Sequence, residues 1–296
     1  MSDRLLGGVE AGGTKMVCAV AREPGVLLDE VRFPTTNARE TLLEVKNFFD
    51  TAQRKWGELA AMGYGTFGPA CVTEGDMNYG TILATPKLGW QGTDVVGFLR
   101  ESFPGVALAY DTNVNAAAMG EGLCGAAQGL KNYVYITVGT GIGGGVVVNN
   151  SPLHTHPHAE IGHMLVPLHD GEVAGFQGIC PFHGACLEGL ASGTAMRERW
   201  DVPAQDLEPT HRAWELEAAY LASMVQNLVA SYGPERIILG GGVMEQEFLL
   251  ERVKEKFKQS AGGYWEEYDN LLVNPGLKNQ AGIIGALCMA ERALSS

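Results

Sequence analysis

Apolar positions in the first third of the chain run in short stretches that predict β-strands joined by a turn of glycines. Residues 5–21 have the pattern of a strand, a glycine turn and a second strand, and residues 26–35 extend it into a third strand. Residues 40–57 place their apolar side chains at helical spacing. Strands follow at 59–70, which ends in a glycine and proline loop, and at 105–111.

The second half of the chain begins with the same pattern. Residues 132–150 again predict strand, glycine turn and strand, so we interpret the two hairpins as a weak internal duplication. A long amphipathic helix is predicted at 210–233, a strand, glycine turn and helix at 235–257, and an apolar-faced helix at 279–294. Strands that alternate with helices predict an α/β fold with mixed sheets.

The chain has no low-complexity linker, so we place the boundary between two lobes near residues 112–116. We expect an N-terminal α/β lobe at 1–113 and a C-terminal α/β lobe at 114–278. The helix at 279–294 is expected to pack back on the first lobe.

Composition narrows the possible functions. The formal net charge of −13 and the pI of about 5.0 argue against nucleic acid and anionic membranes as partners. The chain begins without the apolar run of a signal peptide, and no later segment is apolar enough to span a bilayer, so we expect a cytoplasmic protein. Six cysteines in 296 residues do not form a dense disulfide framework, and clustered Cys and His then suggest a metal.

Three glycine turns predict a phosphate site. The first, Gly12–Lys15, adds a hydroxyl and a charge to glycines that let the backbone approach an anion, although it lacks the spacing of a Walker loop. Taken alone, it fits a tight hairpin better. The turn at 137–145 has more glycines than a hairpin needs, and the turn at 238–244 is predicted to open a helix whose amides suit an anion. Together the three turns favour a phosphate-binding cleft between the lobes.

The segment at 158–193 carries the most specific motif of the chain. Cys180, His183 and Cys186 form a Cys-x2-His-x2-Cys motif, and His163 lies upstream across a loop. Two thiolates and two imidazoles suit a tetrahedral zinc ion with every coordination position filled, which predicts a structural zinc loop at 163–186. The other nearby histidines are interpreted as solvated loop residues rather than ligands: His154, His156, His158 and His169.

These motifs resemble the ROK family of sugar kinases, which has the same Glu160-x-x-His163 pair followed by a zinc loop and the sequence CLEGLASG at 186–193. The resemblance covers essentially the whole chain. It implies the two-lobed actin/hexokinase-like (ribonuclease H-like) fold with an interdomain cleft, a homodimer, and the use of ATP, Mg2+ and a structural Zn2+. It places Glu10, where many members have aspartate, near a hydrated magnesium ion. It assigns the nucleotide contacts to Gly12, Gly13, Thr14, Lys15, Gly139, Thr140, Gly141, Thr194, Gly240, Gly241, Gly242, Val243 and Met244.

Within this family the fructokinase branch is the most similar, on the sequences GTFGPA at 65–70, ATPKLGW at 84–90 and CPFHGACLEGLASG at 180–193. The resemblance implies fructose as the substrate, with mannose or glucose as secondary substrates. It departs from the branch at Thr194, which stands where the branch usually has proline. The sugar contacts that it implies are Pro69, Thr112, Asn113, Glu160, His163 (also a zinc ligand) and Glu188.

The catalytic base is the main departure from the family. Sugar kinases of this fold need a carboxylate to accept the proton of the attacking hydroxyl. The branch has TDVNAAALGE, whereas this chain has TNVNAAAMGE, which puts Asn113 at the position of the base. Asp111 lies two residues earlier, about 6–7 Å away in an extended segment, too far to replace the base without a rearrangement. We interpret Asp111 as a polar contact, and Asn113 as a residue that orients the hydroxyl and caps the following helix.

Loss of a general base typically costs about 10²–10⁴ in rate, so we expect a chain of low or no activity, and a rate at least about a hundredfold higher after Asn113→Asp. Two origins fit: a substitution made to hold sugar and ATP without turnover, which the otherwise intact motifs favour, and a natural member with weak activity. The alternatives in function are another hexose kinase and a sugar-binding, catalytically inactive ROK protein. A ROK repressor is disfavoured, because the first strand begins too early for a preceding helix-turn-helix and the charge is strongly negative.

Overall fold

The computed structural model forms two compact units of mixed α/β structure. It describes residues 4–85, 87–155, 158–265 and 270–295. Unit 1 contains residues up to 129, residues 152–159 and the chain from 279 onward, and unit 2 contains residues 130–151 and 160–278.

Unit 1 is built on a five-stranded sheet of order β3-β2-β1-β4-β5. Its strands are β1 (Leu5–Ala11), β2 (Lys15–Ala21), β3 (Leu27–Pro34), β4 (Leu59–Thr66) and β5 (Ala107–Thr112). β1, β2 and β3 are antiparallel neighbours, while β1, β4 and β5 run parallel. The carboxyl ends of the three parallel strands therefore share one edge, where ligands bind in open α/β sheets.

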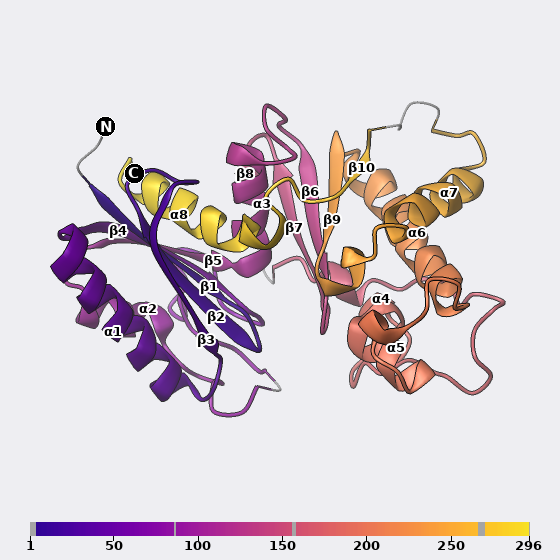
Figure 1. The fold of residues 1–296 in the computed structure, drawn as a ribbon, viewed down its shortest axis with the longest axis horizontal. Coiled ribbons are helices and arrows are strands. Elements are labelled where there is room, and N and C mark those ends of the chain that lie inside the picture. The colour runs from indigo at the N-terminus through magenta and orange to yellow at the C-terminus, as the bar shows by residue number, and fades with distance from the viewer. Residues whose placement is uncertain (1–3, 86, 156–157, 266–269, 296) are drawn as a thin grey trace. The chain divides into compact units, whose positions relative to one another are not determined.

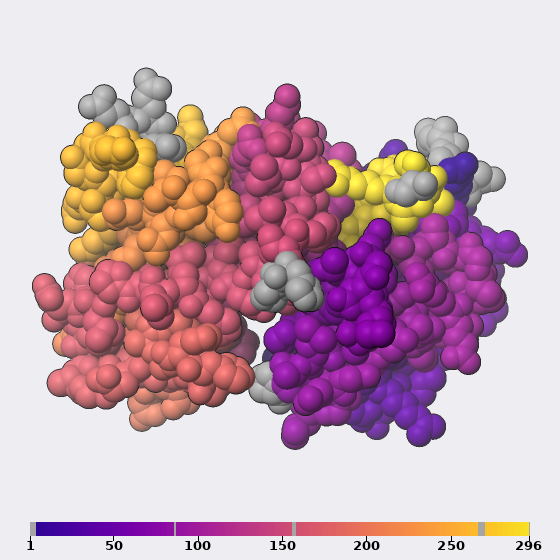
Figure 2. Space-filling view, turned by 180° about the vertical axis from the view of Figure 1, so that it is seen from behind, coloured from indigo at the N-terminus to yellow at the C-terminus, as the bar shows by residue number. Residues whose placement is uncertain are grey.

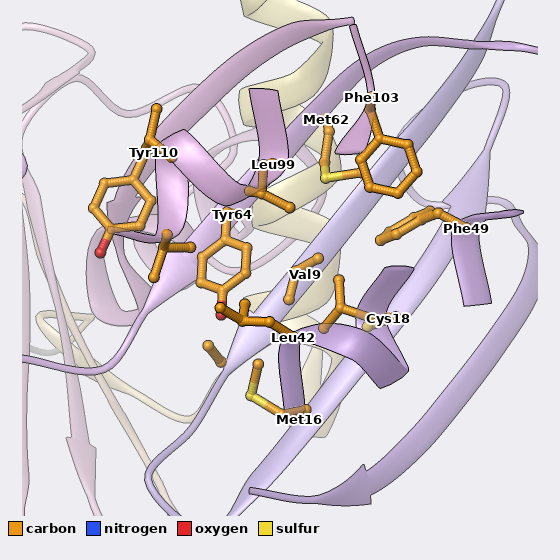
Figure 3. Packing of buried hydrophobic residues seen from close by; sticks show 14 of the residues in the cluster. Val9, Met16, Cys18, Leu42, Phe49, Met62, Tyr64, Leu99, Phe103 and Tyr110 are labelled. Carbon is orange, nitrogen blue, oxygen red and sulfur yellow. The ribbon is translucent and has the colours of Figure 1, made fainter. Parts of the chain in front are cut away.

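Helices cover both faces of this sheet. Figure 1 shows α1 (Ala38–Trp56) and α2 (Val95–Ser102) on one face and α8 (Ala281–Ala293) on the other. The α1 face holds the main core, which includes stacked Tyr64 and Tyr110 and the edge-to-face pair of Phe49 and Phe103 (Figure 3). On the opposite face, strand residues pack against α8, whose yellow surface lies beside the violet N-terminal residues in Figure 2.

Helix α3 (Asn113–Cys124) belongs to unit 1, because it packs along α8. The contact is so close that a Cβ on Gly285 would collide with the carbonyl of Ala116. This grouping differs from the expected division after residue 113, which leaves α3 outside the first lobe.

Unit 2 has a second five-stranded mixed sheet, of order β10-β9-β6-β7-β8. The strands are β6 (Tyr133–Val138), β7 (Ile142–Val148), β8 (Ser151–Pro152), β9 (Arg236–Gly240) and β10 (Leu272–Val273). Its α-helices are α4 (Leu187–Ala191), α5 (Gly193–Trp200), α6 (Ala213–Tyr232) and α7 (Leu249–Ala261). As in unit 1, the first strand of a hairpin also pairs in parallel with a later strand, here β6 with β9.

The short 3-10 helices of the chain lie at η1 (Ile161–His163), η2 (Ala204–Asp206), η3 (Gly242–Glu245) and η4 (Lys278–Gln280). The helix expected directly after the third glycine turn is therefore only the 3-10 turn η3, and α7 begins later, at Leu249. Gly241, which precedes this turn, has φ of +93° and lies against the backbone of Val138. Across the residues that the structure describes, every helix is too short or too polar to traverse a bilayer.

Candidate active site

The first glycine turn, Gly12–Lys15, connects β1 to β2 and is held from outside by Thr35. Within the turn, Gly12 N donates to Lys15 O at 2.9 Å. Thr35 donates two further hydrogen bonds to the turn. Its hydroxyl donates to Gly12 O at 2.7 Å, and its amide donates to Thr14 O at 3.0 Å. These bonds all end on backbone carbonyls of the turn, and among them only the bond within the turn uses a turn amide, that of Gly12.

Lys87 also holds this turn, although the sequence motif around it gave no indication of that role. Its ammonium donates to the carbonyls of Gly13 and, at 2.9 Å, of Thr35. Gly13 and Thr35 are 74 and 52 positions away from Lys87 in the chain, so no local sequence pattern predicts these contacts. The ammonium also brings a positive charge to the turn that the resemblance assigns to phosphate.

Glu10, near the end of β1, carries a carboxyl oxygen that is buried without a partner in the described part of the chain, Oε2. Burial raises the pKa of Glu10, and the charges of Lys15 and Arg32 oppose that rise. The carboxyl lies so close to Gly282 that a side chain there would collide with it. An unpartnered buried carboxyl oxygen is a feature that a hydrated cation would satisfy.

At the carboxyl end of β5, Thr112 and Asn113 begin helix α3. Thr112 is the N-cap, and its hydroxyl accepts a hydrogen bond from Asn115 N at 3.1 Å. The expectation that Asn113 caps the helix is therefore wrong: Asn113 is the first helical residue. Its side-chain amide instead donates to Ala11 O, at the end of β1, at 3.4 Å. This bond brings the ends of β1 and β5 together.

Asp111 is a polar contact at the end of β5, and it is almost fully enclosed. One carboxylate oxygen accepts from Thr112 N at 2.7 Å and from Asn115 Nδ2 at 2.8 Å, and the other lies 2.7 Å from His154 Nε2. His154 is thus an exposed loop residue, as expected, but its ring is also hydrogen-bonded to Asp111. Its bond to the Asp111 carboxylate raises the pKa of His154 above the usual value against the opposing effect of burial, and Glu74 adds to the rise.

Pro69 follows β4 at the same edge of the unit 1 sheet, after a cis peptide bond, and its carbonyl accepts from Leu83 N at 2.8 Å. The loop that carries His154 also reaches this point, because a Cβ built on Gly68 would lie 3.5 Å from Nε2 of His158. His156 lies outside the described residues. The edge formed by β1, β4 and β5 thus holds Glu10, Pro69 and Asn113.

The second glycine turn, between β6 and β7, is tied to helix α5 within unit 2. Gly193 N donates to Gly139 O at 2.7 Å, and the hydroxyl of Thr194 donates to Thr140 O at 2.7 Å. Thr194, which stands where the branch usually has proline, thus bonds to the turn that the resemblance assigns to the nucleotide. The third turn lies at the end of β9, where Met244 N donates to Gly241 O at 3.0 Å.

The remaining expected sugar contacts lie in unit 2, around the start of β7 and helix α4. Glu188, in the first turn of α4, accepts a hydrogen bond from Ile142 N at 2.8 Å through Oε2. Its carboxylate lies directly beside Gly141. Glu160 precedes the 3-10 helix η1 and His163 ends it, so a single turn separates these two side chains.

The four predicted metal ligands converge in unit 2. The ligand atoms of His163, Cys180, His183 and Cys186 all lie within 4.8 Å of one another. Nδ1 of His163 lies 3.5 Å from Sγ of Cys186 and 3.8 Å from Sγ of Cys180, which is 3.6 Å from Nδ1 of His183. Zinc bonds of about 2.3 Å to sulfur and 2.1 Å to nitrogen put such ligands about 3.6 Å apart in a tetrahedron. The donor set and its spacing therefore fit zinc.

Two units that each pair a hairpin with a parallel strand, with glycine turns at the strand ends, are typical of the actin- and hexokinase-like class of α/β proteins. The chain belongs to the ROK family, whose sequence model matches residues 6–293. It is 40% identical over 295 residues to a fructokinase from Zymomonas mobilis, covering 98% of this chain and 97% of that protein. A fructokinase from Pediococcus pentosaceus is 40% identical over 294 residues, covering 99% of each chain.

Among solved structures, a ROK hexokinase from Thermus thermophilus has the same fold, with a TM-score of 0.80 and 29% sequence identity. The match covers 98% of this chain and 99% of that one. The predicted fold class and family are thereby confirmed.

Proposed function

We propose that this protein transfers the γ-phosphoryl group of ATP to the 6-hydroxyl of D-fructose, giving fructose 6-phosphate and ADP. The observation that carries the proposal is the 40% identity to fructokinases over nearly the whole of both chains. A full-length match at this level includes both glycine hairpins and the Cys/His loop, and not the fold alone.

Each unit carries glycine turns that are candidates for nucleotide contacts. In unit 1, the turn Gly12–Lys15, which Thr35 holds through carbonyls of the turn, would bind phosphate oxygens through its glycine backbone and the side chains of Thr14 and Lys15. In unit 2, Gly139–Gly141 and Thr194 would hold phosphate, and Gly240–Met244 would lie by the adenosine. Glu10 would hold a hydrated Mg2+, which neutralises charge on the phosphates during transfer.

Each unit also carries side chains that are candidates for sugar contacts. Glu160, His163 and Glu188 offer convergent acceptors and donors for hydroxyls. Pro69, Thr112 and Asn113 supply the contacts from the unit 1 sheet edge. A zinc ion on Cys180, His183, Cys186 and His163 would fix the loop at 163–186, which carries His163 and is flanked by Glu160 and Glu188.

Asn113 limits the rate in this proposal. Its amide can orient the attacking hydroxyl but cannot accept the proton, and Asp111 is already engaged in three hydrogen bonds. The same observation favours the second candidate function, a sugar-binding protein of this family without turnover. A third candidate, phosphorylation of mannose or glucose, differs only in which hydroxyl arrangement the contacts accept.

The experiment that tests the proposal is an ADP-release assay with Mg-ATP and fructose, mannose or glucose, run on this chain and on its Asn113→Asp form. The proposal predicts ADP release that is fastest with fructose and a product that phosphoglucose isomerase accepts. Binding of fructose in a calorimeter with no ADP release from either form would support the binding protein instead.

We further propose a homodimer in a reducing, cytoplasmic setting. The dimer rests on the family resemblance, and light scattering on the purified protein tests it. The setting is supported by the state of the cysteines, since all six are free thiols.

A further inference from the structure

Buried Asp111, two residues before the position at which the family has its base, is hydrogen-bonded to the exposed His154. The Asp111 side chain is 6% exposed, and its oxygens accept bonds from Thr112 N, Asn115 Nδ2 and the imidazole of His154. The carboxylate is therefore enclosed and held in place by three hydrogen bonds. His154 differs from Asp111 in its exposure, because 46% of the His154 side chain is accessible to solvent.

We propose that His154 accepts the proton of the fructose hydroxyl in this chain, supporting a slow turnover in the absence of a carboxylate at position 113. The proposal rests on the proposed function. It adds a catalytic residue that neither the sequence motifs nor the family resemblance points to.

The chemistry follows from the hydrogen bond between the pair. A carboxylate can only accept, so His154 donates Nε2–H to Asp111, at 2.7 Å, and Nδ1 keeps its lone pair. The buried carboxylate also stabilises the imidazolium that forms when Nδ1 takes up a proton. This is the relation of an oriented imidazole base to its carboxylate in hydrolytic triads.

The placement of the loop brings this imidazole to the correct edge of unit 1. The loop at 152–159 belongs to unit 1, and it contacts the end of β5 through Asp111 and the segment after β4 through His158 and Gly68. Asn113 starts helix α3 from the same strand end, held to Ala11 O. His154 is thus connected through one carboxylate to the residues that carry the expected sugar contacts.

The transfer of the phosphoryl group with His154 as the base requires no reactant besides fructose and ATP. The O–H bond of the fructose 6-hydroxyl breaks as its proton moves to Nδ1 of His154, and the oxygen forms a bond to the γ-phosphorus. The bond from that phosphorus to the β,γ-bridging oxygen breaks, and ADP leaves with the electron pair. The imidazolium then returns its proton to water.

The pH dependence of the step can be assigned to His154. The charged groups that face the imidazole are Asp111 and Glu74, and both raise its pKa. The nearby phenol of Tyr79, which interacts with both carboxylates, has its pKa raised to about 12 by burial and does not ionise near neutrality. A base must be unprotonated to act, so kcat of this chain rises with pH through an inflection above the ordinary histidine value of about 6.5.

The test compares His154→Gln in two backgrounds, this chain and its Asn113→Asp form, by ADP release with fructose and Mg-ATP. Glutamine can still donate an amide N–H to Asp111 but cannot take up a proton, so it separates a catalytic role from a structural one. His169→Gln, at an exposed loop histidine, is the matched control. Thermal unfolding of each variant verifies that it is folded.

We expect His154→Gln to lower kcat of this chain about tenfold or more, to remove the inflection from its pH profile, and to leave KM for fructose within about threefold. The fold-loss should be much smaller when Asp is at position 113. An unchanged kcat, or an equal fold-loss in both backgrounds, would overturn the role of His154. ADP release that is measurable only in the Asn113→Asp form would also overturn the role of His154, but it would agree with the proposed function. Absence of fructose phosphorylation in both backgrounds would instead overturn the proposed function itself.

Discussion

At the end of β5, two side chains of nearly equal shape have different roles because their surroundings differ. Asp111 is enclosed and bonded to backbone, amide and imidazole, so its charge serves to hold other groups. Asn113 has a single 3.4 Å bond to Ala11 O, which leaves its amide able to orient a ligand. Charge alone would select Asp111 as the catalytic residue, whereas the family resemblance assigns the position of the base to Asn113.

A second residue of interest is Glu217, which is buried in helix α6 with both carboxyl oxygens unpartnered among the described residues. Burial raises its pKa well above the usual value, against the opposing charge of Arg199. Because the pKa of Glu217 is higher in the folded than in the unfolded protein, its favourable contribution to the free energy of unfolding is complete below about pH 4.5, the unfolded pKa. This contribution is lost as pH rises from the unfolded pKa to the folded pKa. We therefore predict that Glu217→Gln gains stability relative to the parent as pH rises, by up to about 1.4 kcal/mol per pH unit.

Urea unfolding of both proteins at several pH values between 5 and 8 measures this difference. Glu235→Gln is a control whose stability difference from the parent should stay nearly constant over this pH range, because the amides of Asn132 and Lys131 lower the pKa of Glu235 below its unfolded value. Its contribution is present above the unfolded pKa and is lost as pH falls. A difference between Glu217→Gln and the parent that does not vary with pH would contradict a protonated, buried Glu217.

At the scale of elements, the first and the second glycine turn are each held by a segment distant in sequence. Thr35 and Lys87 hold the first turn, and the start of α5 holds the second. In both turns, the residues from the distant segment donate hydrogen bonds to carbonyl oxygens of the turn. These bonds hold the turn backbone, and with it the orientation of the turn amides. The turns are therefore positioned before a nucleotide binds, which lowers the entropic cost of binding.

We predict that Lys87→Ala weakens ATP binding roughly threefold or more, because two charge-assisted hydrogen bonds to the first turn are lost. Calorimetric titration with Mg-ATP measures the effect. Lys46→Ala, which removes an ion pair with Asp50 on the surface of α1, should leave ATP affinity unchanged. Equal affinities for the parent and the Lys87 variant would show that the lysine does not position the turn.

The elements with strong periodicity were predictable from sequence, and the contacts between distant segments were not. Hairpins, α1 and α6 follow from apolar spacing, and the Cys-x2-His-x2-Cys spacing anticipated the converging ligands. The short helix α2 and the two-residue strand β10 are too brief to leave a pattern. His154 and Asp111 are 43 residues apart, so only the folded chain could show that this histidine is bonded.

At the scale of the whole molecule, the chain repeats one plan in two units, with the Cys/His loop at 163–186 added to the second. That loop has few apolar anchors, and Leu165 and Phe182 within it are largely exposed. Its conformation must therefore depend on the Cys/His cluster more than on a core of its own. A metal ion there would stabilise unit 2 and the expected sugar contacts Glu160 and His163 together.

We predict that the purified protein holds about one zinc per chain, and that chelation lowers its Tm by several degrees or more. Zinc content by atomic absorption and a thermal scan with and without phenanthroline test this. Cys180→Ser should lose the metal, whereas Cys124→Ser, at an exposed thiol outside the cluster, should retain it. A metal-free protein with an unaltered Tm under chelation would contradict a structural zinc site.

The most direct test of the central claim is the ratio of kcat values for the Asn113→Asp form and this chain, measured with fructose and saturating Mg-ATP. If this is a fructokinase whose base position holds an amide, the ratio is at least about one hundred, and KM for fructose changes by less than about threefold. Equal kcat values for the two forms would contradict the claim.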